Sequence, residues 1–264
     1  MLSEHQKKEF TERGYFIISN GFSHTDIEEM RLRLDNIIEG DFKKNNRRFQ
    51  IDSDSGRYED LIYPSDTGYR GANVPYRKIS DLEYDDLFLQ KLQSGWIREV
   101  CSELVDDVVS IMRVTMMDKP PYGGTPLPWH QDISLDWPAT SSPRLTLWFP
   151  LDDATTDSGT IQVVPGSHNL GVIGRGHMLP VSQEEQLTKG GITVEIKAGD
   201  CLFFHPGLLH RSGVNQTNLH RRAINAIFMP GYSFHTIRKS RYPVLFGSGQ
   251  LDPVQVSEVD TIPI

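Results

Sequence analysis

The 264-residue sequence predicts a mostly β protein, a sandwich of jelly-roll type with helices packed on its outside. Two observations lead to this fold class. Short apolar runs separated by Gly, Pro, Asn and Asp follow one another from residue 107 onward, and helical periodicity is concentrated before that point. No internal repeat indicates a second domain. We therefore predict one domain over 1–264, composed of a mainly helical part with a lid loop (1–106), a jelly-roll core (107–232) and a C-terminal extension (233–264).

The first forty residues are expected to form a helix, a short strand and a second helix. Ser3 and Gln6 make a capping-box pattern ahead of "KKEFTER", and Gly14 is placed to end that helix. The run "YFIIS" that follows is rich in β-forming residues. Ser23 can cap the second helix, which carries apolar residues at helical spacing: Ile27, Met30, Leu34 and Ile37.

The segment 40–77 loses this periodicity. It is rich in Asp, Ser, Gly and Arg, yet it carries Tyr58, Tyr63, Tyr69 and Tyr76. A long stretch without secondary structure inside a compact domain is uncommon and is often functional. We therefore expect a loop folded over a pocket in preference to a domain boundary. The next run, "DLFLQKLQSGWIREVCSEL", is typical of a helical region and adds to the helical layer.

Five apolar runs from residue 107 onward predict strands separated by turns. They are "VVSIMRVTMM", "RLTLWFPL", "TIQVVPGS", "GITVEIKAGDCLFF" and "RRAINAIFMP". Several short strands at this spacing favour a sandwich or barrel, which is the basis of the predicted class.

The composition narrows the function and the compartment. A formal net charge of −8 argues against a chain whose main task is binding nucleic acid or an anionic membrane. Cys101 and Cys201 are the two cysteines and form no CxxC pair, so we expect no disulfide framework. The chain starts without an apolar signal core, and no apolar run approaches the ~18 residues of a membrane span. We expect a cytoplasmic protein.

The stretch "PWHQDISLDWP" contains the first sign of a metal site. If it lies at a strand end, His130 and Asp132 point to the same face and Gln131 to the other. Together with one distant histidine they would form the two-histidine, one-carboxylate face that suits non-haem Fe(II). An ordinary core or surface pair is the alternative. His205 and His210, which flank "PGLL" after a predicted strand, are the favoured third ligands, and the residues themselves do not separate the two.

Four separated stretches carry a resemblance to a known family. They are "WHQDISL" (129–135), "LTLWFPLDDATTDSGTIQVVPGSH" (145–168), "AGDCLFFHPGLLHRSGVNQT" (198–217) and "RRAINAIFM" (221–229). In sequence, order and spacing they resemble the phytanoyl-CoA dioxygenase family of Fe(II)- and 2-oxoglutarate-dependent oxygenases. The resemblance is close over the C-terminal half of the chain. It implies a double-stranded β-helix, a cupin-like jelly roll, as the core.

The resemblance implies that His130, Asp132 and His210 are the iron ligands and form the catalytic centre. It selects His210, in "LLHRSGVN", over His205. Halogenases related to this family have a small residue at the carboxylate position, so Asp132 argues against halogenation.

The resemblance also implies how 2-oxoglutarate is bound. The family's arginine lies eleven residues beyond the distal histidine, which here is Arg221, while Arg222 would point to the opposite face of the strand. Ser212 and Trp148 match the positions that complete this co-substrate site. The chemistry agrees, because the planar fork of an arginine holds a carboxylate through two parallel hydrogen bonds.

The implied activity is hydroxylation of an unactivated C–H bond of a small-molecule metabolite, with Fe(II), 2-oxoglutarate and O2, and with release of succinate and CO2. Desaturation, cyclisation or epimerisation at the same iron site is the first alternative, and a non-catalytic iron-binding jelly-roll sensor is the second. We expect neither a nucleic acid nor a membrane as partner. The residues that we expect near the substrate are Asp136, Trp137, Arg175, His177 and Lys78, with Tyr63 and Tyr69 in the lid.

Overall fold

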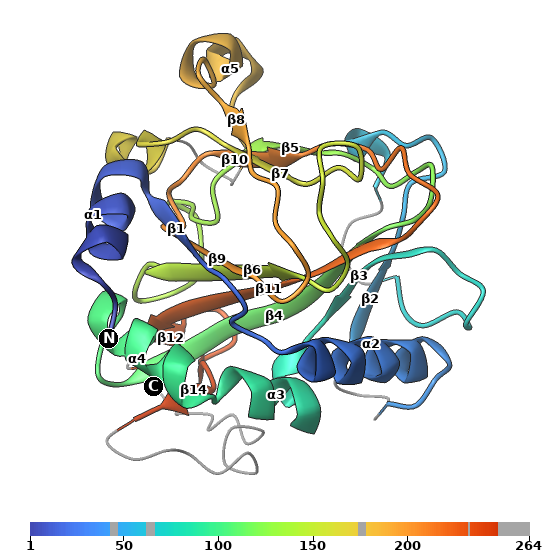
Figure 1. The fold of residues 1–264 in the computed structure, drawn as a ribbon, viewed down its shortest axis with the longest axis horizontal. Coiled ribbons are helices and arrows are strands. Elements are labelled where there is room, and N and C mark those ends of the chain that lie inside the picture. The colour runs from blue at the N-terminus through green and yellow to red at the C-terminus, as the bar shows by residue number, and fades with distance from the viewer. Residues whose placement is uncertain (43–46, 62–66, 174–177, 232, 248–264) are drawn as a thin grey trace.

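The computed structural model describes residues 1–42, 47–61, 67–173, 178–231 and 233–247. Two antiparallel sheets face each other, and helices cover the outer face of the larger one (Figure 1). This major sheet has the strand order β1-β9-β6-β11-β4-β3-β2, and β14 pairs with β4. Its strands are β1 (Tyr15–Ile18), β2 (Arg48–Ile51), β3 (Tyr76–Ser80), β4 (Val109–Lys119), β6 (Leu145–Pro150), β9 (Cys201–Phe204), β11 (Arg221–Pro230) and β14 (Val244–Phe246).

The smaller, minor sheet closes the other side of the sandwich. Its order is β5-β10-β7-β8, and it lies above the major sheet in Figure 1. The strands are β5 (Leu127–His130), β7 (Ile161–Val163), β8 (Ile192–Thr193) and β10 (His210–Ser212), and β12 (Phe234–His235) pairs separately with β13 (Ser240–Arg241). The predicted mostly β class is confirmed by this arrangement.

The first two helices begin at their predicted capping residues, and the first ends at the predicted glycine. Helix α1 (Glu4–Arg13) has the Ser3–Gln6 capping box and ends at Gly14, whose φ of 83° is left-handed. Helix α2 (His24–Ile38) has a capping box at Ser23. The predicted third helical region is divided into α3 (Asp86–Leu92) and α4 (Gly95–Leu104). Helix α5 (Val181–Leu187) stands above β8 in Figure 1. Short 3-10 helices are η1 (Tyr58–Asp60), η2 (Leu82–Tyr84) and η3 (Ser167–Leu170).

The two faces of the major sheet have different neighbours, and β11 shows how the sequence separates them. Ile224 and Phe228 belong to the apolar cluster that also contains the buried residues of α2, α3 and α4. Ala223 lies on the opposite face, in a second cluster that includes residues of the minor sheet. Arg221 and Asn225 share that inner face by the period of two and line a pocket there. The polar pocket therefore occupies the inside of the sandwich, while the helices cover the larger core.

A β-bulge in β4 changes which residues face the pocket. Ile227 of β11 pairs with Arg113 and the next residue, Phe228, pairs with Ile111, so Met112 is the extra residue. Ile111 belongs to the core on the helix side of the sheet. After the bulge, the residues of β4 in that core are even-numbered, Val114 and Met116. Without the bulge Arg113 would share the face of Ile111. With it, Arg113 lies on the inner face and lines the pocket.

The structure differs from the expectation of one continuous loop over 40–77. Arg48–Ile51 and Tyr76–Ser80 are strands that extend the edge of the major sheet beyond β4. Their alternation is too short to stand out in the sequence, and pairing to neighbouring strands supplies the hydrogen bonds that hold them. Gln50 and Tyr58 from this segment line the pocket, so the segment does contribute to its wall.

Both cysteines are buried and free, in line with the expected absence of a disulfide framework. In the part of the chain that the structure describes, no helix is both long and apolar enough to cross a membrane.

The stability of the fold should depend on the protonation of Glu83, which lies in η2. Its carboxylate is buried and accepts a hydrogen bond from the backbone N–H of Val114 at 2.9 Å, and burial raises its pKa from 4.5 to about 7. When folding raises the pKa of an acid, the protonated acid favours the folded state. This contribution to stability is fully present below the pKa of the unfolded chain and is lost as pH rises through the pKa of the folded protein. Relative to Glu83→Gln, the free energy of unfolding of the wild type should fall by about 3 kcal/mol between pH 4.5 and a pH above 7. Urea unfolding across this pH range measures the free energy of unfolding of both proteins. A difference between the two free energies that stays constant with pH would contradict this prediction.

Candidate active site

The three predicted metal ligands meet where β5 and β10 lie side by side. His130 ends β5, His210 begins β10, and the antiparallel register pairs the two residues directly. Their ring centroids are 4.0 Å apart. Asp132 follows β5, and its backbone N–H donates to the carbonyl oxygen of Pro206 at 2.7 Å, which fixes the turn. One ligand atom from each of the three buried residues lies within 4.8 Å of the other two.

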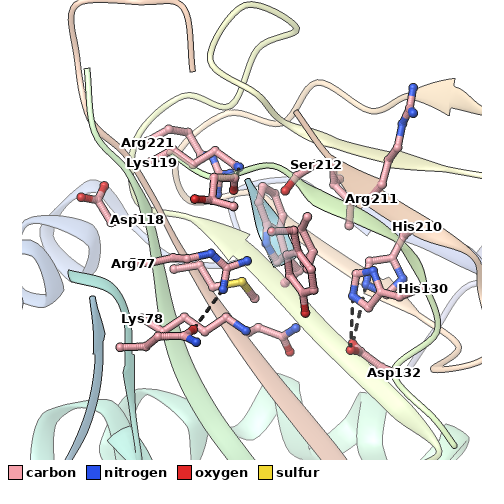
Figure 2. Close-up of a pocket in the computed structure, with 18 of the residues that line it drawn as sticks. Arg77, Lys78, Asp118, Lys119, His130, Asp132, His210, Arg211, Ser212 and Arg221 are labelled. Atoms are coloured by element: carbon pink, nitrogen blue, oxygen red, sulfur yellow. Dashed lines mark hydrogen bonds and ion pairs between the residues drawn. The ribbon is translucent and has the colours of Figure 1, made fainter. Parts of the chain in front are cut away.

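The orientation of the rings suits a metal. Nδ1 of His130 lies 2.9 Å from the carbonyl oxygen of Pro128, and Nδ1 of His210 lies 2.9 Å from that of Leu208. A carbonyl only accepts, so each Nδ1 carries a proton and each Nε2 faces inward. The two Nε2 atoms are 3.9 Å from Oδ1 and Oδ2 of Asp132, respectively (Figure 2). The space between these groups attracts positive charge, and two imidazoles with one carboxylate are the donor set that suits iron(II).

The Asp132 carboxylate is oriented by neighbours from the major sheet. The hydroxyl of Thr146 donates to Oδ2 at 3.3 Å, and the side chain of Asn225 also hydrogen-bonds to the carboxylate. Burial favours the neutral acid, but the adjacent histidines and Arg113 outweigh it and hold the pKa of Asp132 below its ordinary value. The group is therefore an anion with a fixed orientation, as a metal ligand needs to be.

A polar pocket extends from these three residues between the two sheets. Figure 2 shows His130, Asp132 and His210 on one side, and Arg221, Lys119 and Ser212 at a distance from them. Arg77 and Lys78 form a further part of the wall. The described lining contains six arginine and lysine side chains and two carboxylates: Arg77, Lys78, Arg113, Lys119, Arg211 and Arg221, with Asp118 and Asp132. The pocket is therefore suited to anions.

Arg221 and Arg222 point to opposite faces of the major sheet. Arg222 donates to Asp152 through its Nε and Nη2, both at 2.9 Å, so its guanidinium is held outside the pocket. Arg221 is buried in the pocket and donates through Nη2 to the carbonyl oxygen of Gly159 at 3.1 Å. Its buried Nε has no partner among the described residues. Burial lowers the pKa of Arg221 to about 10, so it remains a cation at neutral pH and needs an acceptor.

Two lysines add to this positive pocket. Lys119 pairs with Arg221 across β4 and β11, and its Nζ donates to the carbonyl oxygen of Thr125 at 3.1 Å. Burial, and then the charges of Arg221 and Arg77, lower the pKa of Lys119 well below its ordinary value. Burial, and then Arg77 and Arg113, do the same for the pKa of Lys78. A bound anion would favour the charged form of both lysines.

A model of the phytanoyl-CoA dioxygenase (PhyH) family matches residues 10–223. The chain belongs to the phytanoyl-CoA dioxygenase family. This is a family of iron(II)- and 2-oxoglutarate-dependent oxygenases, so the protein is an oxidoreductase and the predicted enzyme class is confirmed. The match also includes most of the N-terminal helical part, where the resemblance was not close. Among curated relatives, the probable phytanoyl-CoA dioxygenase of Caenorhabditis elegans is 25% identical over 249 residues, which cover 85% of this chain and 74% of that protein.

Solved structures with similar folds confirm the jelly-roll class. The EctD structure from S. alaskensis with 2-oxoglutarate and 5-hydroxyectoine superimposes with a TM-score of 0.70 at 18% identity, covering 96% of this chain and 86% of that one. The epimerase SnoN, in complex with Fe3+, alpha-ketoglutarate and nogalamycin RO, has a TM-score of 0.69 at 16% identity, with coverage of 88% and 85%.

The co-substrate residues predicted from the family all reach the pocket. Ser212 and Trp148 line it together with Arg221, and the Trp148 ring centroid is 5.8 Å from Cζ of Arg221. The structure also separates the two histidines that the residues alone left open. His205 packs against His168, with ring centroids 5.3 Å apart, and its Nδ1 accepts from a loop N–H. His205 is outside the ligand cluster of this phytanoyl-CoA dioxygenase family member.

The residues predicted to contact substrate have mixed positions. Lys78 lines the pocket, whereas Asp136 is exposed and neither it nor Trp137 is part of the described lining. The turn after Asp132 carries both residues past the pocket, although Trp137 contacts Arg113 at its edge. Tyr69 packs among Phe42, Phe49 and Tyr76, away from the metal ligands. Arg175, His177 and Tyr63 lie outside the described residues.

Several lining residues were missed by the sequence analysis. Lys119, Arg77 and Arg113 come from strands that were expected only as core or loop. Lys119 carried one usable signal, because it forms a charged pair with Asp118 directly after the run "VTMM". For Arg113 the sequence contains no such signal, since a bulge cannot be read from the pattern of apolar residues.

Proposed function

We propose that this family member hydroxylates an unactivated C–H bond of a small-molecule metabolite, with His130, Asp132 and His210 as ligands of iron(II) and Arg221 as the anchor of 2-oxoglutarate. The observation that carries the proposal is the pocket that joins the ligand cluster to the buried guanidinium with an unpartnered Nε. A dicarboxylate with one end at the metal and the other at Arg221 would fill it. The EctD structure holds 5-hydroxyectoine together with 2-oxoglutarate, and this hydroxylated compound supports the proposed reaction type.

Each side chain has a defined task in this account. The two histidines and Asp132 would hold iron(II) through two imidazole nitrogens and a carboxylate. Thr146 and Asn225 hold the Asp132 carboxylate in one orientation. When bound, iron(II) with 2-oxoglutarate and O2 supplies the oxidising power for C–H cleavage, and succinate and CO2 are the co-products.

The far carboxylate of 2-oxoglutarate is held by the chain's own donors. Arg221 offers Nε and one side of its guanidinium, and the hydroxyl of Ser212 can add a hydrogen bond from β10. Trp148 covers the same end with its ring and excludes water from the ion pair. The burial of Arg221 strengthens this interaction, because an ion pair is electrostatically stronger in a low-dielectric site.

Product analysis tests the reaction type. The iron-loaded protein is incubated with O2, 2-oxoglutarate and a panel of metabolites, and succinate formation is measured. The molecular mass of the product from the best substrate is then determined by mass spectrometry. Hydroxylation predicts a gain of one oxygen atom. A loss of two hydrogen atoms would indicate desaturation or cyclisation, and an unchanged mass with altered stereochemistry would indicate epimerisation, as expected of an epimerase such as SnoN. No succinate with any substrate would count against a dioxygenase.

A further inference from the structure

We propose that the substrate of this site is an anion and that Arg113 binds its carboxylate or phosphate group beside the metal. This inference rests on the proposed function of the same pocket and names the substrate class that the pocket selects. It is carried by the position of Arg113, by the way metal binding changes its surroundings and by the distribution of charge along the pocket.

Arg113 lies on the substrate side of the ligand cluster. The bulge at Met112 turns its side chain onto the inner face of β4, and 40% of that side chain remains exposed. The Nη2 atom of Arg113 lies 3.7 Å from Oδ1 of Asp132, and its Cζ lies 5.9 Å from the centroid of the Trp137 ring. Arg113 therefore reaches from the metal ligand to the open edge of the pocket.

Metal binding removes the present partner of Arg113. Asp132 is the only carboxylate with which Arg113 forms an ion pair among the described residues. Once Asp132 ligates a divalent cation, its charge is shared with the metal, and Arg113 is left near a net positive centre. The guanidinium is then available to bind another anion at the same place. The open metal positions and the C–H bond to be attacked are also there, so the anion that fits is a group of the substrate.

The co-substrate cannot supply this anion with its far carboxylate. Arg221 pairs with Lys119 at one end of β4, and Arg113 lies six residues away along that strand. Six residues of extended strand place the two backbone positions about 20 Å apart, so the far carboxylate held at Arg221 lies at the other end of the pocket from Arg113. The two basic ends of the pocket therefore serve two different carboxylate or phosphate groups.

The charge balance of the pocket leads to the same result. Of the six arginine and lysine side chains in the lining, Arg211 is directed outward, since it stacks on Trp129 and donates to Gln162. Three arginines remain, Arg77, Arg113 and Arg221, with two lysines whose charged form a bound anion would favour, against Asp118 and Asp132. Iron(II) and the 2-oxoglutarate dianion cancel each other, so their arrival leaves this excess unchanged. A negatively charged substrate reduces it, and a neutral or cationic one does not.

Anion binding to the Mn(II)-loaded protein tests the proposal without turnover. With Mn(II) and saturating 2-oxoglutarate bound, 13C-acetate and, separately, inorganic phosphate are titrated, and Mn(II)-enhanced nuclear relaxation reports binding near the metal. We expect Arg113→Gln to raise the dissociation constant of the preferred anion about tenfold or more, and Arg113→Lys to raise it less. The anion that binds more tightly identifies the substrate group as carboxylate or phosphate. Neutral 13C-acetamide should bind much more weakly than acetate.

The control is Arg98→Gln, which removes the same charge from α4 on the helical face and should leave anion binding within about twofold. The proposal is overturned if wild type binds Mn(II) and 2-oxoglutarate but neither anion, if Arg113→Gln binds both anions like the wild type, or if acetamide binds as well as acetate. It is also overturned if Arg113→Gln loses affinity for 2-oxoglutarate, because Arg113 would then serve the co-substrate. Failure of the wild type to bind Mn(II) and 2-oxoglutarate at all would instead contradict the proposed function.

Discussion

Replacing His210 with alanine is expected to lower the affinity for a divalent transition metal by at least ~100-fold and to abolish turnover. Residues that merely orient ligands contribute 10–100-fold to metal affinity, so the loss of a ligand should exceed that range. Asp132→Ala should have an effect of similar size, because it also leaves two histidines without the anion between them. Equilibrium dialysis against Mn(II) measures the affinity directly, without the need for a substrate.

His205→Ala is the matched control for His210→Ala. His205 lies five residues earlier in the same segment and packs against His168 outside the ligand cluster, so it is a packing residue rather than a ligand. We expect His205→Ala to keep its metal even if its melting temperature falls. Retention of metal by His210→Ala, together with loss in His205→Ala, would reverse the choice of third ligand.

Arg221→Ala is expected to weaken 2-oxoglutarate binding by about 2–5 kcal/mol, which is at least ~30-fold, while metal affinity stays nearly unchanged. The reason is the buried guanidinium, whose Nε has no acceptor in the described part of the protein until a carboxylate arrives. Calorimetric titration of 2-oxoglutarate into the Mn(II)-loaded protein provides the measurement. Arg221→Lys should recover only part of the affinity, because a lysine lacks the planar fork.

Arg222→Ala removes an adjacent arginine of the same strand and gives the opposite result. It should leave 2-oxoglutarate binding within a few-fold and should lower the free energy of unfolding by ~1–3 kcal/mol, because it breaks charge-assisted hydrogen bonds to Asp152. If Arg222→Ala and not Arg221→Ala weakens 2-oxoglutarate binding, the assigned roles of the two arginines are wrong.

The sequence was sufficient where local chemistry decides the structure. Helix α1 begins and ends at its capping residues, Ser3 and Gly14, because those residues satisfy terminal backbone groups within a few positions of the chain. The separation of Arg221 from Arg222 followed from the period of two in a strand. The family resemblance then placed the distal ligand at His210, which the residues alone had not separated from His205.

The sequence was insufficient where contacts between distant segments decide. Strand β2 forms because it pairs with β3, which in turn pairs with β4, and no pattern within Arg48–Ile51 predicts a strand there. The bulge at Met112 depends on pairing with β11, so Arg113 could not be placed on the pocket side in advance. Asp136 was predicted near the substrate from its closeness to Asp132 in the chain, but the turn between them carries it to the surface.

The central claim is that His130, Asp132, His210 and Arg221 together form an iron and 2-oxoglutarate site. Anaerobic addition of Fe(II) and 2-oxoglutarate to the metal-free protein tests it most directly. A chelated keto acid on Fe(II) gives a weak visible metal-to-ligand charge-transfer band, and we predict that this band forms with wild type, requires both additions and is lost in His210→Ala. Wild-type protein that binds Fe(II) and 2-oxoglutarate without the band, or an equal band in His210→Ala, would contradict the account.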